Sequence, residues 1–324
     1  MKSFQLVILS DIHYAGAAER ARGNDYELAA IANPGMRLAA RLYRHYVWMR
    51  RPMERGLMLD RFLAEAGPAD AVVVNGDHCA DSAFIGLRDP ASLESARECL
   101  AKITARYGAK AHFIFGDHEA GKLTMFSGKG GMFLASWRAG TEQLGLKPFW
   151  QVTLGNYVLM GVASPLLVLP ASQSDTQPEE WPEWQRLRAE HLAEIRAAFD
   201  ALQPEQRVLL FCHDPSALPY LAREESVRRR LPQIEHTIIG HLHTNLIMWK
   251  SRLLSWMPPI TFLGHFIRKI STALSQSRAW RLFKVKLCPA LAGIELLNDG
   301  GYFTVTLDPA ARRPAEFVFH RLRR

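Results

Sequence analysis

The sequence predicts an α/β fold, because short apolar runs typical of buried strands alternate with longer stretches that have a helical pattern. Residues 4–9, 71–75 and 111–115 are the first strand-like runs, and helical patterns cover residues 36–65 and 92–107 between them. Strand, helix and strand at this spacing predict right-handed crossovers and a largely parallel arrangement. The ends of successive strands should therefore meet at one edge of a sheet.

The alternation continues to the C-terminus, and no internal repeat or low-complexity tract divides the chain. We therefore expect a single domain over residues 1–324. The remaining expected elements are two short strands within 149–163 joined at Gly155-Asn156, a helix at 183–202, a strand at 207–212, a basic helix around Arg228, a strand at 236–239, a hairpin of 293–297 with 302–307, and a last strand at 316–321.

Composition indicates a globular protein with an anionic partner. Hydrophobic residues make up 48% of the 324 residues, and Lys and Arg outnumber Asp and Glu by 40 to 32. This excess fits a nucleic acid, an acidic membrane surface or a phosphorylated substrate. The four cysteines form no C-x-x-C pair, so neither a disulfide framework nor a zinc ribbon is expected. No apolar run approaches the ~20 residues that span a bilayer, and the N-terminus lacks a signal-peptide pattern, so we expect a cytoplasmic location.

Residues 34–66 are expected to form a basic helical insert. Leu38, Leu42, Tyr46 and Met49 repeat at helical spacing and would share one face, and Pro52 should break the stretch into two helices. Positions 28–53 contain five arginines and no acidic residue. The insert could be a solvated basic helix packed on the domain, or a helix that faces an anion or a membrane; its sequence favours neither.

Carboxylates and imidazoles follow five of the expected strands, directly where each strand ends. These residue types supply the oxygen and nitrogen ligands that suit manganese, iron or zinc, with open positions for water and substrate. A structural role could account for any one of these residues. It does not account for carboxylates and imidazoles at the ends of five strands. The residues are Asp11, His13, Asp77, Asp117, His118, His213, His241 and His243.

In this order the strand ends resemble the motifs of the calcineurin-like metallophosphoesterase superfamily, which are Asp-x-His, Gly-Asp, Gly-Asn-His-Asp/Glu, His and Gly-His-x-His. The resemblance implies a four-layer αββα sandwich with a helical cap. It also implies hydrolysis of a phosphate ester or anhydride with two divalent ions, manganese first and iron or zinc as alternatives. The implied roles are one ion held by Asp11, His13 and His243, the other held by Asp117, His213 and His241, a bridging Asp77, and a catalytic His118 beside the substrate phosphate.

Three positions near these motifs carry further expectations. Asp117 stands where the family normally has Asn, so an anionic ligand replaces a neutral one. Three ligating carboxylates against two divalent ions would leave about one net positive charge, compared with about two for the usual set. His78 is expected either to donate to a phosphate oxygen or to pack beside the site. Glu119 is expected to orient His118 or a ligand histidine.

A second basic segment is expected at residues 249–289, as an amphipathic helical insert. Residues 236–294 contain no Asp or Glu but eight Lys and Arg. Its amphipathic pattern with nearby tryptophans is typical of helices that lie in a membrane interface, and Arg268 and Lys269 are candidates for substrate contact. A helical hairpin packed over the active site is the alternative.

The substrate class follows from this segment and from the resemblance. The chain is similar in architecture to bacterial UDP-diacylglucosamine hydrolases of lipid A biosynthesis, although it lacks their usual Gly-Asp-x-Phe-Glu and Gly-His-Thr-His forms. We therefore expect a lipid-linked nucleotide as substrate and peripheral contact with the anionic inner face of a membrane. A nucleotide or nucleic-acid phosphodiesterase is the second hypothesis, and a non-catalytic scaffold is the third. The oligomeric state stays open.

Overall fold

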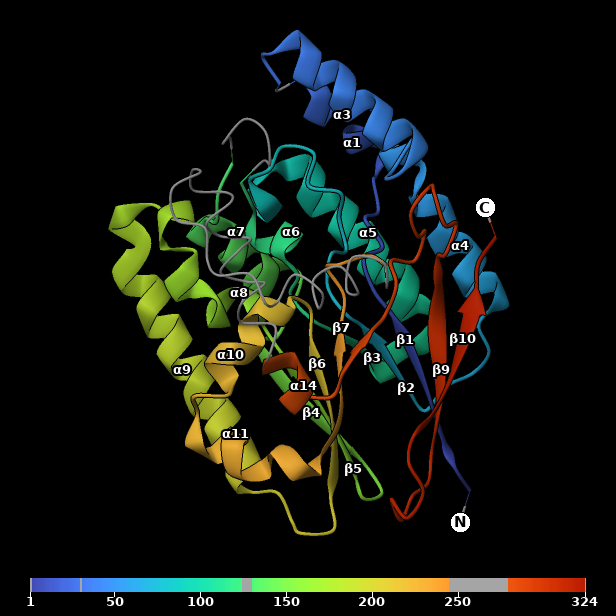
Figure 1. Ribbon diagram of the computed structural model, residues 1–324, viewed down its shortest axis with the longest axis vertical. Helices are drawn as coiled ribbons and strands as arrows, with labels where there is room; N and C mark the ends of the chain where they lie inside the picture. The colour runs from blue at the N-terminus through green and yellow to red at the C-terminus, as the bar shows by residue number, and fades with distance from the viewer. Residues whose placement is uncertain (1, 30, 124–129, 245–278, 324) are drawn as a thin grey trace.

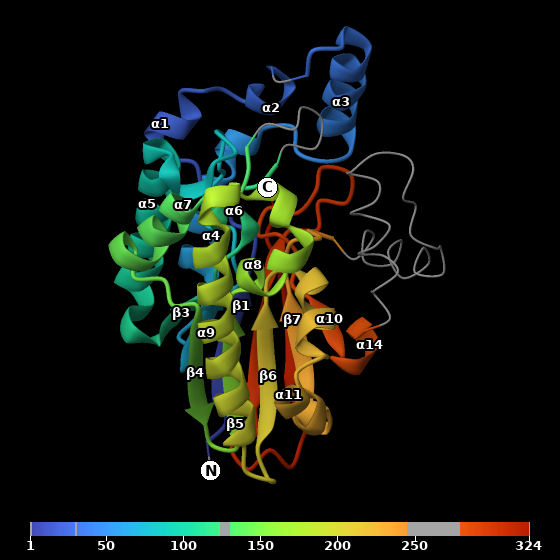
Figure 2. The same ribbon diagram turned by 90° about the vertical axis from the view of Figure 1, so that its left-hand side faces the viewer.

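The chain folds into two mixed β-sheets packed face to face, with helices on both outer faces (Figures 1 and 2). The computed structural model describes residues 2–29, 31–123, 130–244 and 279–323. The helices in these ranges are α1 (Ala17–Arg20), α2 (Tyr26–Ala29), α3 (Pro34–Tyr46), α4 (Gly56–Glu65), α5 (Pro90–Tyr107), α6 (Asp117–Ala120), α7 (Leu134–Arg138), α8 (Ser164–Leu167), α9 (Trp181–Asp200), α10 (Leu218–Leu221), α11 (Glu225–Arg230) and α14 (Ala279–Leu282).

The first sheet contains the N-terminal strand at its centre. Strand β1 (Phe4–Leu9) pairs in parallel with β2 (Ala71–Val74), which pairs in parallel with β3 (Ala111–Phe113). On its other side β1 pairs antiparallel with β9 (Gly301–Leu307), and β9 pairs antiparallel with β10 (Glu316–Arg321). Strands β1, β2 and β3 therefore end at the same edge of the sheet.

The second sheet begins with the expected hairpin. Strand β4 (Phe149–Leu154) pairs antiparallel with β5 (Tyr157–Val162). The parallel strands β6 (Arg207–Cys212), β7 (Ile234–Ile239) and β8 (Val285–Leu287) then follow β5 in that order. Strands β6 and β7 bring the second set of polar strand ends to one edge.

Apolar side chains fill each space between the layers. Between the sheets, Ile8 of β1 and Phe211 of β6 are fully buried. Behind the first sheet, α4 and α5 bury side chains such as Phe62 and Ile103, and behind the second sheet α9 buries Phe199. Strands covered on both faces must be apolar along their length, which is why they read as continuous apolar runs. The four-layer αββα sandwich is confirmed.

The C-terminal hairpin differs from the expectation. Residues 293–297 form no strand, and β9 pairs with β10 instead. At Gly293 the backbone has a φ of 63°, and a Cβ there would overlap the backbone of Gly300. The chain therefore turns at the position where a strand was expected, because this conformation favours glycine.

The expected basic inserts have different outcomes. Residues 34–66 form α3 and α4 on either side of Pro52, but α4 packs against the first sheet and belongs to the sandwich. Of residues 249–289, the stretch 249–278 lies outside the described residues. In the rest, α14 is helical, but β8 follows it and pairs with β7, so this end of the segment belongs to the second sheet. Val285 and Leu287 pack their apolar side chains into the sheet, a contribution that the basic composition of the segment concealed.

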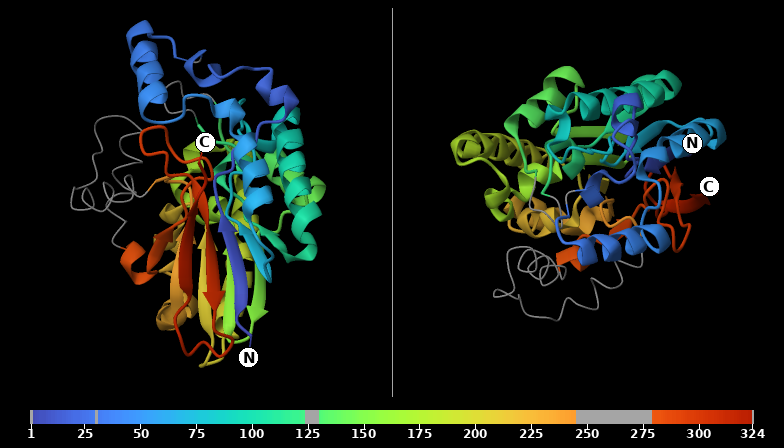
Figure 3. Two further views of the ribbon diagram at one scale, coloured as in Figure 1. Left: turned by 90° about the vertical axis from the view of Figure 1, so that its right-hand side faces the viewer. Right: turned by 90° about the horizontal axis from the view of Figure 1, so that it is seen from above.

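Helix α3 lies at one end of the molecule, on the outside of the sandwich (Figures 1 and 3). Its inward face carries Ala40 and Arg44, which are buried. The row formed by Leu38, Leu42 and Tyr46 faces outward, with exposed fractions of 57%, 49% and 64%. The apolar stripe of the helix is thus on its outer side.

None of the helices in the described ranges combines the length and the apolar character that crossing a bilayer requires.

Candidate metal centre

The polar strand ends of both sheets converge at one place. Asp11 and His13 follow β1, Asp77 follows β2, and Asp117 follows the short turn after β3. From the second sheet come His213 after β6, and His241 and His243 after β7. Two groups within this set have candidate ligand atoms within 4.8 Å of one another, and a third such group joins His118 to Asp77 and Asp117. Strands β1 and β2 are parallel in one sheet, and β6 and β7 are parallel in the other, so the residues that follow them gather at carboxyl ends of strands. This is the edge at which α/β sheets bind ligands.

The backbone at these strand ends is strained. The backbone φ angles are positive at five of the site residues, which is uncommon for residues with a side chain. Such conformations cost about 1–3 kcal/mol each and persist where surrounding structure enforces them, most often at functional sites. Here the enforcement includes hydrogen bonds between neighbouring strand ends, from Asp11 N to Gly76 O at 3.2 Å and from His13 N to Asp77 O at 3.0 Å. The strained residues are Asp11 (50°), His13 (48°), Asp77 (55°), His241 (58°) and His243 (58°).

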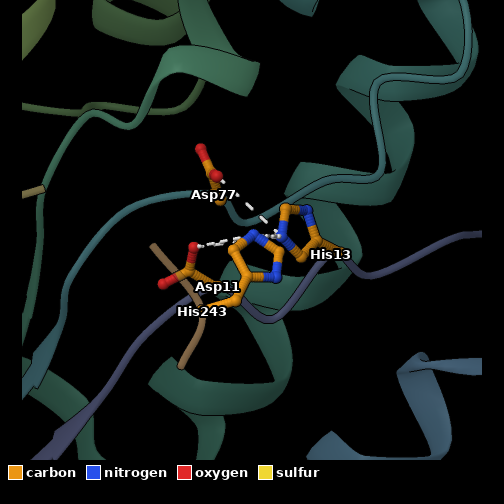
Figure 4. Close-up of side chains that lie close together, drawn as sticks. All are labelled: Asp11, His13, Asp77 and His243. Carbon is orange, nitrogen blue, oxygen red and sulfur yellow. Dashed lines mark hydrogen bonds and ion pairs between the residues drawn. The ribbon is translucent and has the colours of Figure 1, made fainter. Parts of the chain in front are cut away.

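The buried half of the site contains Asp11, His13, Asp77 and His243 (Figure 4). The Nε2 atoms of His13 and His243 lie 3.3 Å apart, and His243 Nε2 lies 3.3 Å from Asp11 Oδ1. Burial lowers the pKa of both histidines well below the ordinary value, so both rings are neutral. Two imidazole nitrogens and a carboxylate oxygen that converge in this way fit a divalent cation.

The more open half contains Asp117, His213 and His241. Asp117 Oδ1 lies 3.2 Å from His213 Nε2 and 3.0 Å from His241 Nδ1. His213 donates from Nδ1 to the carbonyl of Asn75 at 2.6 Å, which directs Nε2 into the site. Burial alone would lower the pKa of His213 and His241, but neighbouring carboxylates, Asp77 and Asp117 respectively, raise it, for His241 to about 9. This group also fits a divalent cation.

Asp77 lies between the two halves. Its Oδ2 atom is 3.9 Å from His13 Nε2 in the buried half and 3.1 Å from His213 Nε2 in the open half. The side chain is 1% exposed, and Gly116 leaves it room, since a Cβ on Gly116 would overlap its carboxylate. This position agrees with a bridging carboxylate; the bridge itself stays a prediction.

His118 faces the same space from the turn after β3. Its Nδ1 donates to the carbonyl of Ala80 at 2.9 Å, and its Nε2 lies 3.8 Å from Asp77 Oδ2. Burial, reinforced by the ammonium of Lys122, lowers the pKa of His118 below its ordinary value. Asp77, Asp117 and His118 also form a group that could hold an ion, so a catalytic and a ligating role for His118 need to be separated by experiment.

Glu119 makes different contacts from those we expected. Its carboxylate contacts no histidine ring in the described structure and instead accepts hydrogen bonds from three backbone N–H groups: Gly116 at 2.8 Å, Asp77 at 3.1 Å and His78 at 2.7 Å. These bonds join the ends of β2 and β3. Burial raises the pKa of Glu119 to about 7. The side chain therefore positions the site through the main chain rather than through an imidazole.

His78 packs beside the site. Its ring is fully buried, and its edge meets Phe113 with the ring centroids 5.7 Å apart. Burial lowers its pKa to about 4, so the ring is neutral. Of the two expectations for this residue, this buried position against Phe113 agrees with packing; contact with a phosphate stays a prediction. Arg268 and Lys269, the other candidates for substrate contact, lie outside the described residues.

Two residues at the site were not predicted from the sequence. Lys122 places its ammonium 3.6 Å from Asp117 Oδ2 and in contact with His118 Nε2. Trp48, in the segment after α3, places its ring 4.8 Å from the ring of His243. The position of Lys122, four residues after His118, was a signal that could have been followed; for Trp48 the sequence offers none.

A sandwich of two sheets with carboxylates and imidazoles gathered at its strand ends defines a metal-dependent hydrolase. The family model for calcineurin-like phosphoesterases matches residues 4–245, and the chain belongs to this family. The protein is therefore a metal-dependent phosphoesterase, and the family typically uses a binuclear metal centre.

The other comparisons add little. A search of curated proteins found no match. Among solved structures, the chain is similar to a conserved uncharacterized protein from Streptococcus pneumoniae TIGR4, described as a predicted phosphoesterase. The similarity covers 99% of both chains at 11% identity with a TM-score of 0.29. At that TM-score the likeness supports no conclusion.

Proposed function

We propose that the protein hydrolyses a phosphate ester or anhydride in a lipid-linked substrate at a membrane surface, with a lipid-linked nucleotide such as UDP-diacylglucosamine as the leading candidate. The proposal includes two divalent ions, manganese first, and a peripheral position on the cytoplasmic face of a membrane. The observation that carries it is the exposed apolar row of α3 beside the metal centre.

The roles proposed for the site residues follow from their positions. Asp11, His13 and His243 would hold one ion, Asp117, His213 and His241 the other, and Asp77 would lie between them. Divalent ions in such a site, when bound, supply an activated water and offset the charge of the phosphate. His118 presents Nε2 to the site, because its Nδ1 donates to the carbonyl of Ala80. In its doubly protonated form it would donate from Nε2 to the phosphate or to the leaving oxygen.

Helix α3 has the features of a helix that lies in a membrane interface. Leu38, Leu42 and Tyr46 form an exposed apolar row along one face. Two arginines of the helix are held by hydrogen bonds to the main chain. Arg37 donates to the carbonyl of Ile31, and Arg44 donates to the carbonyl of Asn24. These bonds fix the helix with its apolar row outward. An exposed row of this kind indicates an interaction surface.

Exposed cations at the edge of α3 favour an anionic lipid surface as the partner of this row. Arg41, Arg50 and Arg51 are exposed near the helix or just after it, and Arg41 and Arg51 also pair with Asp25 and Glu54 at 3.4 and 3.3 Å. Each Arg near an acidic surface contributes up to ~1 kcal/mol of attraction, and apolar burial in the interface adds to it.

The segment after α3 connects this surface to the metal centre. Trp48 packs between Tyr43 of α3, at a ring distance of 6.3 Å, and the site histidine His243, at 4.8 Å. The carbonyls of Val47 and Trp48 accept from the backbone N–H groups of Leu296 and Glu295, which fixes the segment on the sandwich. A membrane bound to α3 would therefore lie next to the metal centre, where a lipid-linked phosphate could reach it.

The test compares two matched double variants. Leu38→Ser with Leu42→Ser removes part of the α3 row, and Leu57→Ser with Val318→Ser removes apolar side chains of similar exposure, 59% and 55%, elsewhere. With Mn²⁺ supplied, we expect the wild type and the control to bind phosphatidylglycerol vesicles and to cleave UDP-diacylglucosamine in mixed micelles. The α3 variant should lose both properties and still hydrolyse a small soluble phosphodiester.

The alternative function is a nucleotide or nucleic-acid phosphodiesterase, since exposed arginines also suit a polyanion. Salt dependence would not separate the two hypotheses, because both kinds of binding weaken with salt. A wild-type protein that binds no vesicles and cleaves single-stranded DNA would replace the lipid hypothesis with this one. The family membership sets the non-catalytic scaffold aside.

A further inference from the structure

Asp117 and Lys122 form an ion pair at the open side of the metal centre. Lys122 Nζ lies 3.6 Å from Asp117 Oδ2, and the two side chains are 32% and 23% exposed. The other site carboxylates, Asp11 and Asp77, are at most 1% exposed. Together with His241, whose side chain is 37% exposed, the pair thus forms the part of the site that a substrate phosphate can meet from solvent.

The two oxygens of Asp117 face different partners. Oδ1 faces the ring nitrogens of His213 and His241 at 3.2 and 3.0 Å, and Oδ2 faces the ammonium of Lys122. An Asn at this position with its oxygen toward the histidines would direct its NH₂ group at the ammonium, which has no acceptor. Aspartate is therefore the side chain that satisfies both partners, and Lys122 gives a physical reason for it.

The charge of the pair is also balanced. Aspartate in place of asparagine removes one positive unit from the net charge of a two-ion site, leaving about one instead of about two. The ammonium of Lys122 adds one unit at the same place. The ammonium also contacts His118 Nε2, the atom that faces the substrate position. The cation therefore lies where a phosphate oxygen would bind.

We propose that Lys122 binds the substrate phosphate and that Asp117 and Lys122 work as a compensating pair, in which the lysine restores the attraction for phosphate that the aspartate removes. This inference rests on the phosphoesterase function, but it does not depend on a lipid-linked substrate. Lysine binds phosphate oxygens through charge-assisted hydrogen bonds, so its loss should weaken binding about ten-fold.

The experiment uses Asp117→Asn, Lys122→Met and the double variant, each loaded with Mn²⁺. The measurements are metal content per chain and the affinity for inorganic phosphate, by calorimetry and by product inhibition of a soluble phosphodiester. Lys122→Met should keep its metal and bind phosphate about ten-fold more weakly. Adding Asp117→Asn removes the uncompensated negative charge and should return the affinity to within about three-fold of wild type.

Two controls make the result specific. Lys122→Arg keeps the charge and should keep the phosphate affinity. Asp60 and Lys102 form an ion pair at 2.6 Å on the surface, and Asp60→Asn with Lys102→Met repeats the same chemical change away from the site with no expected effect.

Three results would overturn the proposal. An unchanged phosphate affinity in Lys122→Met would make the contact incidental. Additive losses in the double variant would remove the compensation. Metal loss in Lys122→Met would mean that the lysine supports the ligand Asp117 rather than the substrate. Because the probe is inorganic phosphate, a failure of the lipid hypothesis would leave this test unaffected.

Discussion

The strand-end cluster and helix α3 are two regions with strong sequence patterns, and the fold treats them in opposite ways. Most of the cluster side chains turn inward and are buried; Asp11, Asp77 and His213 are at most 1% exposed. The apolar row of α3 turns outward, with Leu42 49% exposed. In the cluster, polar groups are buried at a cost in desolvation, and in α3 apolar groups are exposed at a cost in hydration.

The comparison teaches where each region obtains its stabilisation. Carboxylates and imidazoles that face one another without apolar filling are stabilised when a cation binds among them. An exposed apolar row is stabilised when a partner covers it. Neither region serves to hold the sandwich together, and the following variants separate that interpretation from ordinary structural roles.

The largest effect is expected from Asp77→Ala. Asp77 lies near histidines of both halves, at 3.9 and 3.1 Å, so its removal should empty both halves rather than one. Metal content measured by plasma emission should fall from two ions per chain to a trace, and activity should fall to that of chelator-treated protein. Asp60→Ala, on the exposed side of α4, is the control. Retention of one full ion by Asp77→Ala would show that Asp77 serves a single half.

His118→Ala should lower turnover by ~10²–10⁴ while metal content stays near that of the wild type. The reason is that Nε2 faces the substrate position and the remaining ligand groups are complete without it. Turnover of a soluble phosphodiester and metal content are measured on the same samples. A metal loss equal to that in Asp77→Ala would make His118 a ligand.

A pair of stability measurements contrasts α3 with the packed helices. Phe199→Ala in α9 removes a fully buried side chain and should lower the free energy of unfolding by about 3–5 kcal/mol. Leu42→Ala in α3 should change it by no more than about 0.5 kcal/mol, because the side chain is half exposed. Urea unfolding followed by circular dichroism gives both values. A loss above 2 kcal/mol in Leu42→Ala, by the same order-of-magnitude scale, would mean that the row is part of the core.

Most of the sandwich could be predicted from the sequence, because buried strands are continuous apolar runs. Strands β1 and β6 and the β4–β5 hairpin each have such a pattern within their own residues. The strand-end residues could be predicted for the same reason. Long-range contacts could not: Glu119 bonds to the backbone of Asp77 and His78, and no local pattern specifies those partners. The orientation of α3 was equally hidden, since an amphipathic helix has the same sequence pattern whichever side faces the protein. The strand β8 was hidden by its basic neighbours.

Trp48 belongs to both regions, and its substitution should have the smallest effect. Its ring lies 4.8 Å from His243 and 6.3 Å from Tyr43, so it connects the buried half of the metal centre to α3. An aromatic pair contributes about 0.5–1.5 kcal/mol beyond burial, which corresponds to a two- to ten-fold change in affinity. In a chelator competition, the Trp48→Ala variant should therefore show about two- to ten-fold lower affinity for the more weakly bound of its Mn²⁺ ions. The Trp48→Phe variant should behave as wild type. Vesicle binding should change little, because Leu38, Leu42 and Tyr46 stay in place. If Trp48→Ala abolished vesicle binding and left metal affinity unchanged, Trp48 would belong to the membrane surface and the separation between the two regions would have to be redrawn.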